Sequence, residues 1–396
     1  MNQPAMAAQQ QAQMLPGVGR GRRECAIAVL LQCTNLGGME KVAYSLFEQL
    51  QGEGYQLRIA TPRPWGLGRP AVLRADPGAQ AFNYRGKFGW RSFPPFRRHA
   101  HSVAERSHCV WVIGTCASCM AAARSTRRKI LLSHHYHHFE RPFDRLRWTA
   151  FYLAFGPCLD AVTYPTEFTR NEALRIAPWL RSRAHVVRYG FAVHYTNEPQ
   201  RLEERREARA KLRIPQDAFV VGNAGWLIQR KRFDVFLRTA ALIAGQVPRA
   251  QFMICGGGPE EASLRELAAE LGIAERVRFE GWVQDVAQHY RAWDALLFNS
   301  DFDTCPCTPM EAASYGCICA ASCLYGGLSE FLESGRTGVL LNRHDAHQLA
   351  RPLVELVGSP LLALKLREGA AARLRDEFSM KEGLRFYEAY FGSGNE

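Results

Sequence analysis

Two carboxylates, Asp303 and Glu311, follow the end of a predicted strand in the C-terminal half of the chain. Between them, Thr308-Pro309 predicts the start of a helix, because proline is favoured in a first helical turn. We expect Glu311 to lie in that turn, beside the backbone N–H groups and the positive end of the helix dipole, which can bind a phosphate without a metal ion. Carboxylates also accept hydrogen bonds from sugar hydroxyls, so this loop predicts a site for a sugar nucleotide.

Two further segments could bind the same kind of ligand. Lys231 lies at the start of a predicted helix, where a cation opposes the helix dipole, so a lysine that merely decorates the helix start is disfavoured. Gly37 and Gly38 lie at the first predicted strand-to-helix turn, where the missing Cβ atoms let the backbone approach a ligand closely. Both segments therefore predict contacts with a phosphate-bearing ligand.

Histidines and cysteines raise the question of a metal site. Segment 134–138 contains four histidines, but ligands from one short loop rarely complete a coordination shell, and no distant carboxylate partner is evident. Cys116 and Cys119 form an isolated C-x-x-C without a second pair at metal-ligand distance. We therefore expect no metal, and we expect reduced thiols, since a secreted scaffold held by disulfides would be far smaller.

The segments that must position these residues alternate between short apolar runs and amphipathic helices. In the N-terminal half, strands are predicted at 25–33, 57–60, 109–113, 129–132, 160–164 and 185–188. In the C-terminal half, strands at 219–222, 251–255, 277–280 and 295–299 alternate with helices at 232–245, 260–271 and 284–292. This alternation is typical of doubly wound α/β folds, whose ligands bind at the carboxyl ends of the strands. A chain of 396 residues suits two such domains.

Three segments lack this pattern. Residues 63–98 mix proline, glycine, aromatic and basic residues without periodicity, and we expect an elaborated loop there. Residues 139–151 combine aromatic and basic residues, as in a surface helix that contacts anionic lipid; a helix packed on the domain with solvated arginines is an equal alternative. Residues 196–215 are charged and poor in apolar residues, and we interpret them as the interdomain linker.

Charge is distributed unevenly along the chain, whose net charge is +12. Residues 1–195 hold 26 Lys/Arg and 11 Asp/Glu, a net +15, whereas the remainder holds 24 and 27, a net −3. This asymmetry predicts that the N-terminal half faces something anionic, such as a phosphorylated lipid, a membrane surface or nucleic acid; a solvated basic face is the alternative. No run approaches the roughly 20 consecutive apolar residues of a membrane-spanning helix.

The C-terminal half resembles the family-4 glycosyltransferases, also called group 1, in several segments that occur in the same order. The loop is similar to the family's Ser-x-x-Glu-Gly-Phe-Pro-x4-Glu-Ala, with Asp303 at the first glutamate and Glu311 at the second. The other segments are Gly225–Lys231, Gly256-Gly257-Gly258-Pro259, Val277-x-Phe279-x-Gly281, Trp293-Asp294, Gly326-Gly327-x-x-Glu330 and Thr337-Gly338. The resemblance implies the GT-B fold, in which two Rossmann-like, doubly wound α/β domains face each other across an interdomain cleft.

The resemblance also implies roles for the residues of the donor loop. Glu311 is expected to bind the ribose hydroxyls, and Asp303 the hydroxyls of the transferred sugar, although its carboxylate is one methylene shorter than the family's glutamate. Thr308 and Pro309 at the helix start and Gly258 in the glycine turn are the expected donor-binding neighbours.

Lys231 matches the family's lysine that binds the donor diphosphate. Trp226 stands where the family has a phosphate-binding arginine, so Arg230 or Arg232 would have to supply the second positive charge. Gly37 and Gly38 are similar to the family's Gly-Gly-x-Glu loop and complete the predicted donor site.

The family places a functional histidine after the strand that corresponds to 129–132. His134 is our first choice for that residue and His135 the second; a surface loop rich in histidine is the alternative. The catalytic set is then His134, Asp303, Lys231 and Glu311.

The same resemblance places Cys317 and Cys319 on a strand that is buried in the family, where both thiols should face one side as small hydrophobic groups. Cys305 and Cys307 lie in the donor loop, and we expect them to be exposed. No neighbouring residue would make either of them a nucleophile.

The implied reaction transfers a sugar from a nucleoside diphosphate, UDP being preferred, to an acceptor hydroxyl with retention of anomeric configuration and without a cofactor. Because the N-terminal half is basic and aromatic, the expected acceptor is a glycan or a lipid-linked precursor, as in lipopolysaccharide or polysaccharide biosynthesis. The predicted location is the cytoplasm, with peripheral contact to the inner face of the membrane. The predicted contacts to acceptor or membrane are His135, Arg97, Arg98, Arg145 and Arg147.

The predicted organisation is a disordered tail at 1–22, an acceptor domain at 23–200, a donor domain at 201–375, and a helix at 376–396 that crosses back to the first domain. Two other functions fit these features. A hydrolysing sugar-nucleotide epimerase shares the fold but needs no acceptor. A non-catalytic protein for anionic lipid or nucleic acid would explain the charge; we expect no nucleic-acid partner, because no recognised motif for one is present.

Overall fold

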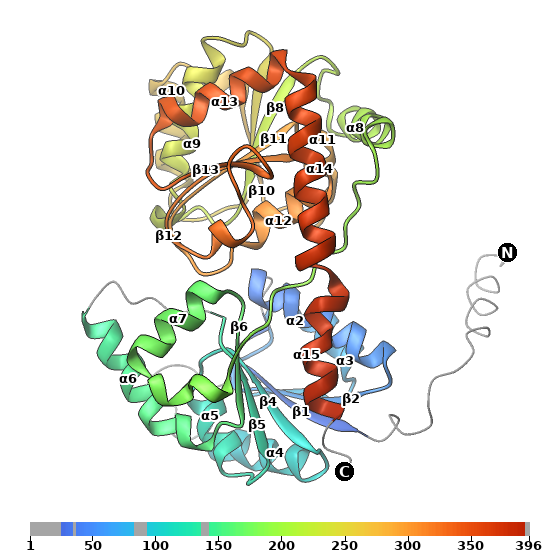
Figure 1. The fold of residues 1–396 in the computed structure, drawn as a ribbon, viewed down its shortest axis with the longest axis vertical. Helices are drawn as coiled ribbons and strands as arrows, with labels where there is room; N and C mark the ends of the chain where they lie inside the picture. Colours follow the sequence, from blue (N-terminus) through green and yellow to red (C-terminus); the bar gives the residue numbers. More distant parts are fainter. Residues whose placement is uncertain (1–24, 35–36, 83–92, 136–141, 393–396) are drawn as a thin grey trace, which may run out of the picture.

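The computed structural model describes residues 25–34, 37–82, 93–135 and 142–392. These residues form two lobes, one above the other along the long axis of the molecule (Figure 1). Each lobe contains a parallel sheet with helices packed on it, the architecture that the alternating sequence pattern predicts. The tail predicted at 1–22 lies outside the described residues.

The N-terminal lobe contains a seven-stranded sheet in the order β3-β2-β1-β4-β5-β6-β7. The strands are β1 (Ala26–Leu31), β2 (Gln56–Thr61), β3 (Gln80–Ala81), β4 (Cys109–Ile113), β5 (Lys129–Ser133), β6 (Ala161–Tyr164) and β7 (Ala184–Val186). Neighbouring strands all pair in parallel, so their carboxyl ends share one edge of the sheet. Every residue of β1 and β4 is buried, as expected for strands covered on both faces.

Helices cover both faces of this sheet. The helices are α2 (Gly38–Gly52), α3 (Arg69–Ala75), α4 (Phe93–Glu105), α5 (Ala117–Arg124), α6 (Pro142–Phe155) and α7 (Glu167–Ile176). α2 and α3 pack with the core around Trp111, and α4 to α7 pack with the core around Tyr152. The predicted surface helix at 139–151 therefore corresponds to α6, whose first residue is Pro142.

The expectation of an irregular loop at 63–98 is wrong. This segment contains α3, β3 and the start of α4, and Phe96 is fully buried against the sheet. The periodicity of apolar residues that marks a helix is hard to see in the sequence here, because α3 and α4 each bury only two or three residues. Prolines and arginines occupy several of the other positions. Residues 83–92 lie outside the described part of the chain.

The C-terminal lobe contains a six-stranded sheet in the order β10-β9-β8-β11-β12-β13. The strands are β8 (Phe219–Ala224), β9 (Ala250–Cys255), β10 (Val277–Gly281), β11 (Ala295–Asp303), β12 (Ile318–Gly326) and β13 (Gly338–Leu341). The helices of this lobe are α8 (Glu198–Leu212), α9 (Phe233–Ala244), α10 (Glu261–Glu270), α11 (Ala287–Ala292), α12 (Cys307–Ser314), α13 (Ala346–Gly358) and α14 (Pro360–Glu377). β11 is longer than predicted and reaches Asp303, which brings this carboxylate to the carboxyl edge of the sheet.

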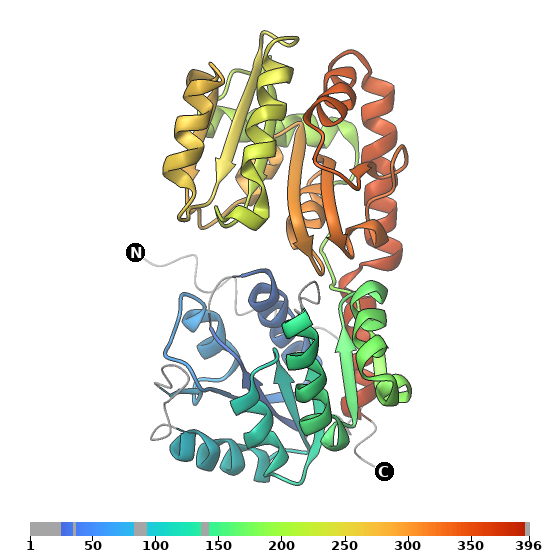
Figure 2. The same ribbon diagram turned by 90° about the vertical axis from the view of Figure 1, so that its left-hand side faces the viewer.

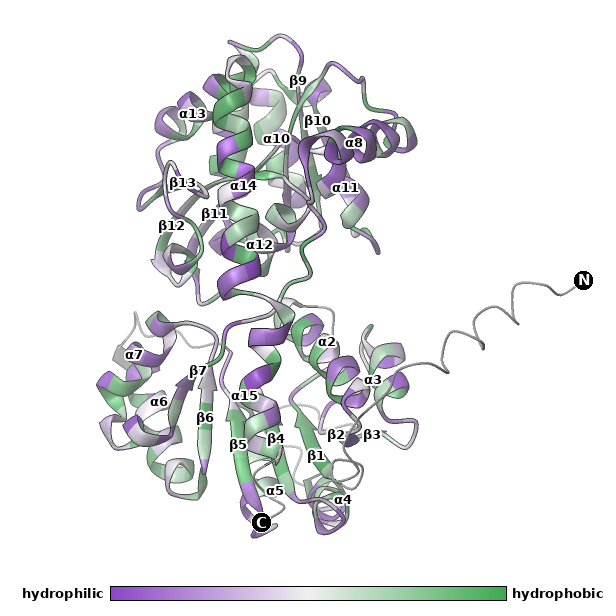
Figure 3. Cartoon of the chain, turned by 45° about the vertical axis from the view of Figure 1, so that its right-hand side comes forward, coloured by the Kyte–Doolittle hydropathy of each residue, from purple (hydrophilic) through white to green (hydrophobic). Residues whose placement is uncertain are grey.

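The segment predicted as a linker, 196–215, is instead mostly the helix α8, which is predominantly hydrophilic (Figure 3). It contributes the buried Ala208 to the core, but most of its buried contacts to the C-terminal lobe come from arginines. Arg209 is fully buried; its guanidinium donates to Asp294 Oδ2 at 2.7 Å and to the carbonyl oxygen of Ala292 at 2.9 Å. A helix anchored by a buried arginine has no apolar stripe, which explains why its sequence suggested a linker.

The C-terminal end of the chain crosses back to the first lobe, as predicted. α14 lies on the C-terminal lobe, and α15 (Met380–Gly392) continues onto the N-terminal lobe (Figure 1, Figure 2). Tyr387 of α15 packs against Trp111 of β4, with ring centroids 4.9 Å apart. None of the described helices is both long enough and apolar enough to cross a lipid bilayer.

Candidate functional site

The carboxyl ends of the two sheets face each other where the lobes meet. Thr304, directly after β11, donates its hydroxyl hydrogen to the carbonyl oxygen of His135, just after β5, at 2.9 Å. On the other side of the junction, a Cβ placed on Gly38 would lie 3.1 Å from the Sγ of Cys307, the first residue of α12. The loops predicted to bind the donor and the acceptor are therefore in contact.

The most concentrated group of charges lies at the end of β11. Lys231 Nζ is 2.5 Å from Asp303 Oδ2, and both side chains are mostly buried. Arg230 Nη1 lies 3.7 Å from the same carboxylate oxygen, and its guanidinium also donates to the carbonyl oxygen of Phe302. Two cations around one carboxylate leave an excess of positive charge, which favours an anionic ligand.

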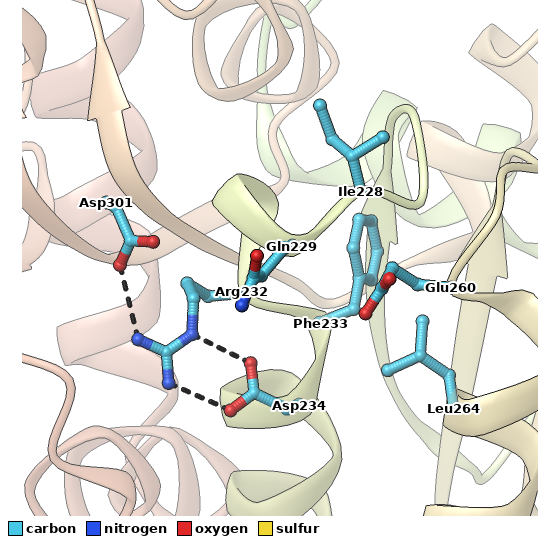
Figure 4. Close-up of a pocket in the computed structure, with 8 residues that line it drawn as sticks. All are labelled: Ile228, Gln229, Arg232, Phe233, Asp234, Glu260, Leu264 and Asp301. Atoms are coloured by element: carbon cyan, nitrogen blue, oxygen red, sulfur yellow. Dashed lines mark hydrogen bonds and ion pairs between the residues drawn. The ribbon is translucent and has the colours of Figure 1, made fainter.

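Arg232 is not available for the same purpose. Its guanidinium makes two hydrogen bonds to Asp234, both 2.9 Å long, and a third to Asp301 at 3.2 Å (Figure 4). Hydrogen bonding to Asp234 raises the pKa of the Arg232 guanidinium. These residues line a pocket of about 420 Å³ in the C-terminal lobe. Of the two arginines proposed to replace the missing one at Trp226, Arg230 is therefore the one beside Asp303.

Close packing of glycine holds Asp303 in place. Asp303 pairs with Gly326 of β12, and a Cβ on Gly326 would lie only 1.8 Å from the carbonyl oxygen of Asp303. Gly326 also has a φ of +149°, which favours glycine. Gly258 has a similar packing role: a Cβ there would lie 2.4 Å from the carbonyl oxygen of Leu227, so the turn after β9 lies directly on the loop that carries Trp226. The exposed indole of Trp226 lies in that loop.

Helix α12 begins at Cys307, with Pro306 as its N-cap residue. The expectation that Glu311 lies in the first turn is therefore wrong, because the helix starts before Thr308 and its first turn contains no acidic residue. Glu311 is instead in the second turn, partly exposed, and its Oε2 accepts a hydrogen bond from the hydroxyl of the buried Tyr290 at 3.0 Å. This bond holds the Glu311 carboxylate against α11, the helix that carries Tyr290.

Thr308 and Pro309 help to position this helix. The hydroxyl of Thr308 donates to the carbonyl oxygen of Ala224 at the end of β8, at 3.3 Å. Pro309 is buried and, as a proline, has no N–H to offer a ligand. The N–H groups at the start of α12 are further candidates for a phosphate contact, and the donor contacts predicted for Thr308 and Pro309 stay predictions.

The expectation that Cys305 and Cys307 are exposed is wrong. Both thiols are buried, and burial raises their pKa values. Cys307 is covered by the Gly37-Gly38 turn of the other lobe, a contact that sequence spacing does not reveal. Cys317 and Cys319 are buried in one common core, as predicted.

The two candidate histidines have different environments. His134 is fully buried, its Nδ1 lies 2.6 Å from the hydroxyl of Tyr152, and its ring packs against Trp148 and Tyr164. His134 is thus enclosed by aromatic side chains of the N-terminal core, and its role in the reaction stays a prediction. Residues 136–141, including the other two histidines, lie outside the described part of the chain.

His135 is the histidine that lies at the junction. Its Nδ1 is 2.7 Å from the hydroxyl of Tyr189, and its Nε2 has no hydrogen-bond partner among the described residues. Burial lowers its pKa from 6.5 to about 4, so the ring is neutral near pH 7. Depending on its tautomer, the Nε2 atom of this neutral imidazole can accept a hydrogen bond from a sugar hydroxyl or donate one to its oxygen.

The predicted basic contacts lie on two helices of the N-terminal lobe. Arg97 and Arg98 are exposed on α4, and Arg145 and Arg147 are exposed on α6, in the helical layer that covers the N-terminal sheet. Arg145 acts electrostatically on Tyr325 of β12, the strand that pairs with the end of β11. The four arginines remain candidates for contacts outside the donor site.

Sequence reasoning did not assign a role to Glu330. Its carboxylate accepts hydrogen bonds from the backbone N–H groups of Glu167 at 3.0 Å and of Phe168 at 2.8 Å, at the start of α7 in the other lobe. Arg188 Nη2 lies 3.7 Å from the same carboxylate. The Gly-Gly-x-x-Glu motif was visible in the sequence, but its partner lies more than a hundred residues away, so only the fold reveals this contact between the lobes.

Two protein-family models match the chain in succession. The family described as Glycosyltransferase Family 4 matches residues 36–195, and that described as Glycosyl transferases group 1 matches residues 204–373. The lipopolysaccharide core biosynthesis glycosyltransferase LpsE of Rhizobium meliloti is 30% identical over 171 residues, which are 43% of this chain and 49% of that protein. The D-inositol 3-phosphate glycosyltransferase of Streptomyces scabiei is 35% identical over 180 residues, which are 42% of this chain and 40% of that protein. The chain thus matches about half, or less, of the length of these curated relatives.

Solved structures extend the likeness to nearly the whole chain. Anabaena HepE in complex with UDP and glucose has a TM-score of 0.78 at 17% identity, covering 93% of this chain and 100% of that one. A glycosyltransferase from Rickettsia africae has a TM-score of 0.76 at 15% identity, covering 94% and 98%. At such identities the likeness shows the fold, which is GT-B. Because the two family models together extend over both lobes, the chain belongs to the family-4, or group 1, glycosyltransferases.

Proposed function

We propose that this protein transfers a sugar from a nucleoside diphosphate sugar to an acceptor hydroxyl. The observation that carries the proposal is the group formed by Lys231, Arg230 and Asp303 beside the start of α12. It combines cations for a diphosphate with a carboxylate for sugar hydroxyls, and the Gly37-Gly38 turn of the facing lobe closes over the same helix. UDP is the preferred nucleotide, because HepE, which has the same fold, was crystallised with UDP and UDP-glucose.

In the proposed mechanism, the bond between the anomeric carbon and the diphosphate breaks first, and negative charge develops on the leaving oxygens. Lys231, Arg230 and the N–H groups at the start of α12 would stabilise that charge electrostatically. These groups supply the positive charge for which other transferases use a divalent ion, so we propose transfer that is independent of metal. Within the described residues, no group of three His, Cys, Asp or Glu side chains is placed to hold a metal ion.

We propose retention of the anomeric configuration, with the acceptor hydroxyl attacking from the face that the diphosphate leaves. The acceptor proton then passes to a leaving phosphate oxygen, so no protein base is required. Asp303 would position the sugar hydroxyls once the ligand competes for Lys231, and the unpaired Nε2 of His135 would hydrogen-bond to the sugar from the other lobe. Contact between the lobes would exclude water from the reacting carbon.

The acceptor that we propose is a glycan or a lipid-linked glycan precursor at the inner face of the cytoplasmic membrane. LpsE acts in lipopolysaccharide core biosynthesis by its name, which supports this class. α6 supplies a second argument. Phe143, Leu146 and Leu153 are exposed on one side of this helix, while Arg145 and Arg147 lie beside them. Exposed apolar residues flanked by arginines are typical of a helix that rests on an anionic lipid surface.

The donor proposal is tested by measuring sugar transfer and nucleotide binding in Lys231→Ala. Loss of one cation at a developing charge costs on the order of 10²–10³ in kcat/KM, so we expect a loss of that size. The matched control is Lys211→Ala, an exposed lysine on α8, which should leave both measurements unchanged. Binding of UDP, GDP, ADP and TDP is compared by calorimetry with and without EDTA.

Binding of one nucleotide that persists in EDTA and weakens in Lys231→Ala supports a metal-independent donor site. Wild-type binding that EDTA abolishes would reject the metal-independent part of the proposal. Release of free sugar at the same rate with and without a glycan acceptor would reject transfer and indicate a hydrolase or epimerase of the same fold.

A further inference from the structure

A pair of cysteines at the start of α5 is not used by the proposed reaction. Cys116 is the N-cap residue of α5, and Cys119 lies in the first turn of the helix. The pair follows β4, at the carboxyl edge of the N-terminal sheet. Residues three apart on a helix are neighbours, with about 5–6 Å between their Cβ atoms. A disulfide needs Cβ atoms about 4 Å apart. Cys116 lies outside the helical geometry, with φ −89° and ψ 116°, and its side chain is close enough to that of Cys119 for a hydrogen bond between the two.

The two thiols have unequal environments. Cys119 is fully buried, whereas Cys116 is partly exposed and its Sγ lies 2.9 Å from the hydroxyl oxygen of Ser118. Hydrogen bonding from the thiol of Cys119 and from Ser118 lowers the pKa of Cys116 to about 5. Burial raises the pKa of Cys119 well above its usual value. The pair therefore combines a partly exposed thiol whose pKa is lowered with a buried thiol whose pKa is raised, which is the arrangement of a reactive dithiol.

The surroundings of the pair connect it to the lobe junction. A Cβ on Gly114, between β4 and α5, would lie 2.5 Å from Gln32 Oε1, so the β4–α5 turn packs directly on the β1–α2 turn. In the β1–α2 turn, the thiol of Cys33 donates to Glu40 Oε1 at 2.8 Å. The Gly37-Gly38 turn that contacts Cys307 belongs to the same segment. A covalent change at Cys116 would therefore take place one loop away from the proposed donor site.

We propose that Cys116 and Cys119 form a redox-active dithiol that a peroxide converts reversibly into an intramolecular disulfide. In the first step, the thiolate of Cys116 attacks a peroxide oxygen; the O–O bond breaks, and protonation releases water (or an alcohol) and leaves a sulfenic acid. In the second step, the sulfur of Cys119 attacks the sulfenic sulfur, the S–O bond breaks, and water leaves with the thiol proton. The two thiols lose two electrons and the peroxide gains them; a small dithiol reverses the change by exchange.

The first test measures the reactivity of the thiols in the intact chain. Alkylation with iodoacetamide at pH 6 should modify Cys116 about tenfold faster than Cys158, because only a thiolate reacts. Cys158 is the matched control: it is also partly exposed, but burial raises its pKa. Equal rates at the two cysteines would overturn the proposal.

The second test follows oxidation. After treatment with hydrogen peroxide and alkylation, peptide 107–124 should lack two hydrogen atoms, carry a single alkyl group on Cys109, and return to the fully alkylated form after dithiothreitol. Fragmentation of the peptide distinguishes Cys109, in β4, from the other two thiols. Oxidation that stops at a sulfinic acid on Cys116, or a disulfide from Cys116 to Cys33, would contradict the proposal.

Two variants separate the roles of the thiols. Cys119→Ser should keep the fast alkylation of Cys116 but accumulate a sulfenic acid that dimedone traps, because the resolving thiol is missing. Cys116→Ser should abolish disulfide formation in peptide 107–124, whereas Cys33→Ser should leave it unchanged. A disulfide that forms equally in Cys116→Ser would reject the assignment. None of these measurements depends on sugar transfer, so a negative result would reject the redox proposal without bearing on the proposed reaction.

Discussion

The two lobes of this protein share an architecture but differ in how far their positive charges are balanced by carboxylates. In the C-terminal lobe, cations and carboxylates pair with each other, as in Arg209 with Asp294 and Lys231 with Asp303. The N-terminal lobe belongs to the half of the chain with a net charge of +15, and arginines are exposed on α4 and α6. Charges that pair inside a lobe fix its loops, whereas unbalanced charges at a surface attract an external partner. The pairs named in the C-terminal lobe hold its own segments together, whereas the net positive charge of the N-terminal half favours an anionic partner outside the protein.

The largest expected effect concerns the internal pair of the C-terminal lobe. Arg209→Ala leaves the buried Asp294 with fewer partners and several backbone carbonyls without a donor, so we expect a loss of about 3–5 kcal/mol in the free energy of unfolding. Arg206→Ala, which removes an exposed pair with Glu203 on the same helix, should cost no more than about 1 kcal/mol. Urea titrations of both variants measure the difference; similar losses would show that the charges of α8 do not anchor it.

The next effect concerns the neutral histidine of the N-terminal lobe. The folded-state pKa of His135, about 4, lies below its ordinary value of 6.5, so the unfolded chain binds the extra proton first as the pH falls. Its contribution destabilises the fold increasingly from about pH 6.5 down to pH 4, and amounts to about 2 kcal/mol at pH 5. His135→Gln should therefore lose less stability than the wild type between pH 7 and pH 5.

Urea titrations at the two pH values measure this difference. His347→Gln, at an exposed position on α13, is the control and should retain the wild-type dependence on pH. The same slope in His135→Gln and in the wild type would mean that folding does not lower the pKa of His135. The imidazole would then become charged as the pH falls through its ordinary pKa of 6.5, instead of staying neutral down to about pH 4.

A contact between the lobes should have an intermediate effect. Glu330→Ala removes the acceptor of two N–H groups at the start of α7, and leaving such groups unpaired costs about 1–3 kcal/mol. We expect the lobes to separate more readily, which small-angle scattering detects as a larger radius of gyration and kinetics as a higher KM for the donor. Glu261→Ala, whose carboxylate forms an exposed pair with Arg265 on α10, is the control. Unchanged dimensions and KM in Glu330→Ala would show that this contact does not hold the lobes together.

The smallest effect tests the external charges. Each arginine near an anionic membrane contributes about 1 kcal/mol, so Arg145→Glu combined with Arg147→Glu should weaken binding to vesicles that contain phosphatidylglycerol, and added salt should reduce the difference. Arg249→Glu, at an exposed site in the C-terminal lobe, is the control. Flotation assays measure the bound fraction. Equal binding of all three proteins, or equal binding to vesicles of phosphatidylcholine alone, would remove the membrane contact from the proposed function.

Sequence periodicity predicted most of the regular core because buried strands and long amphipathic helices have clear patterns. The strands at 109–113 and 251–255 and the helix at 232–245 differ from the observed bounds by no more than a residue at either end. The predictions failed where a helix is held by something other than an apolar stripe. α8 relies on the buried guanidinium of Arg209, and α3 is too short to show a period.

For the candidate site, the sequence identified the loop that contains Asp303 and Glu311 and the basic segment with Lys231, because these lie in continuous motifs. Only the tertiary structure shows which neighbouring side chains are free of internal contacts that would compete with a ligand. Arg232 is engaged by Asp234, and His134 is enclosed by aromatic rings.

By itself, the sequence determined the two-domain α/β class, the family and the motifs that contain Asp303, Glu311 and Lys231, since each is encoded in local pattern or in a contiguous motif. Tertiary structure decided which histidine reaches the junction, that Cys307 lies beneath the Gly37-Gly38 turn, and that Glu330 joins the lobes. These features depend on contacts between residues that are distant in the chain. Such contacts leave no local pattern, because the burial and the hydrogen bonds that define them exist only once both lobes have folded and met.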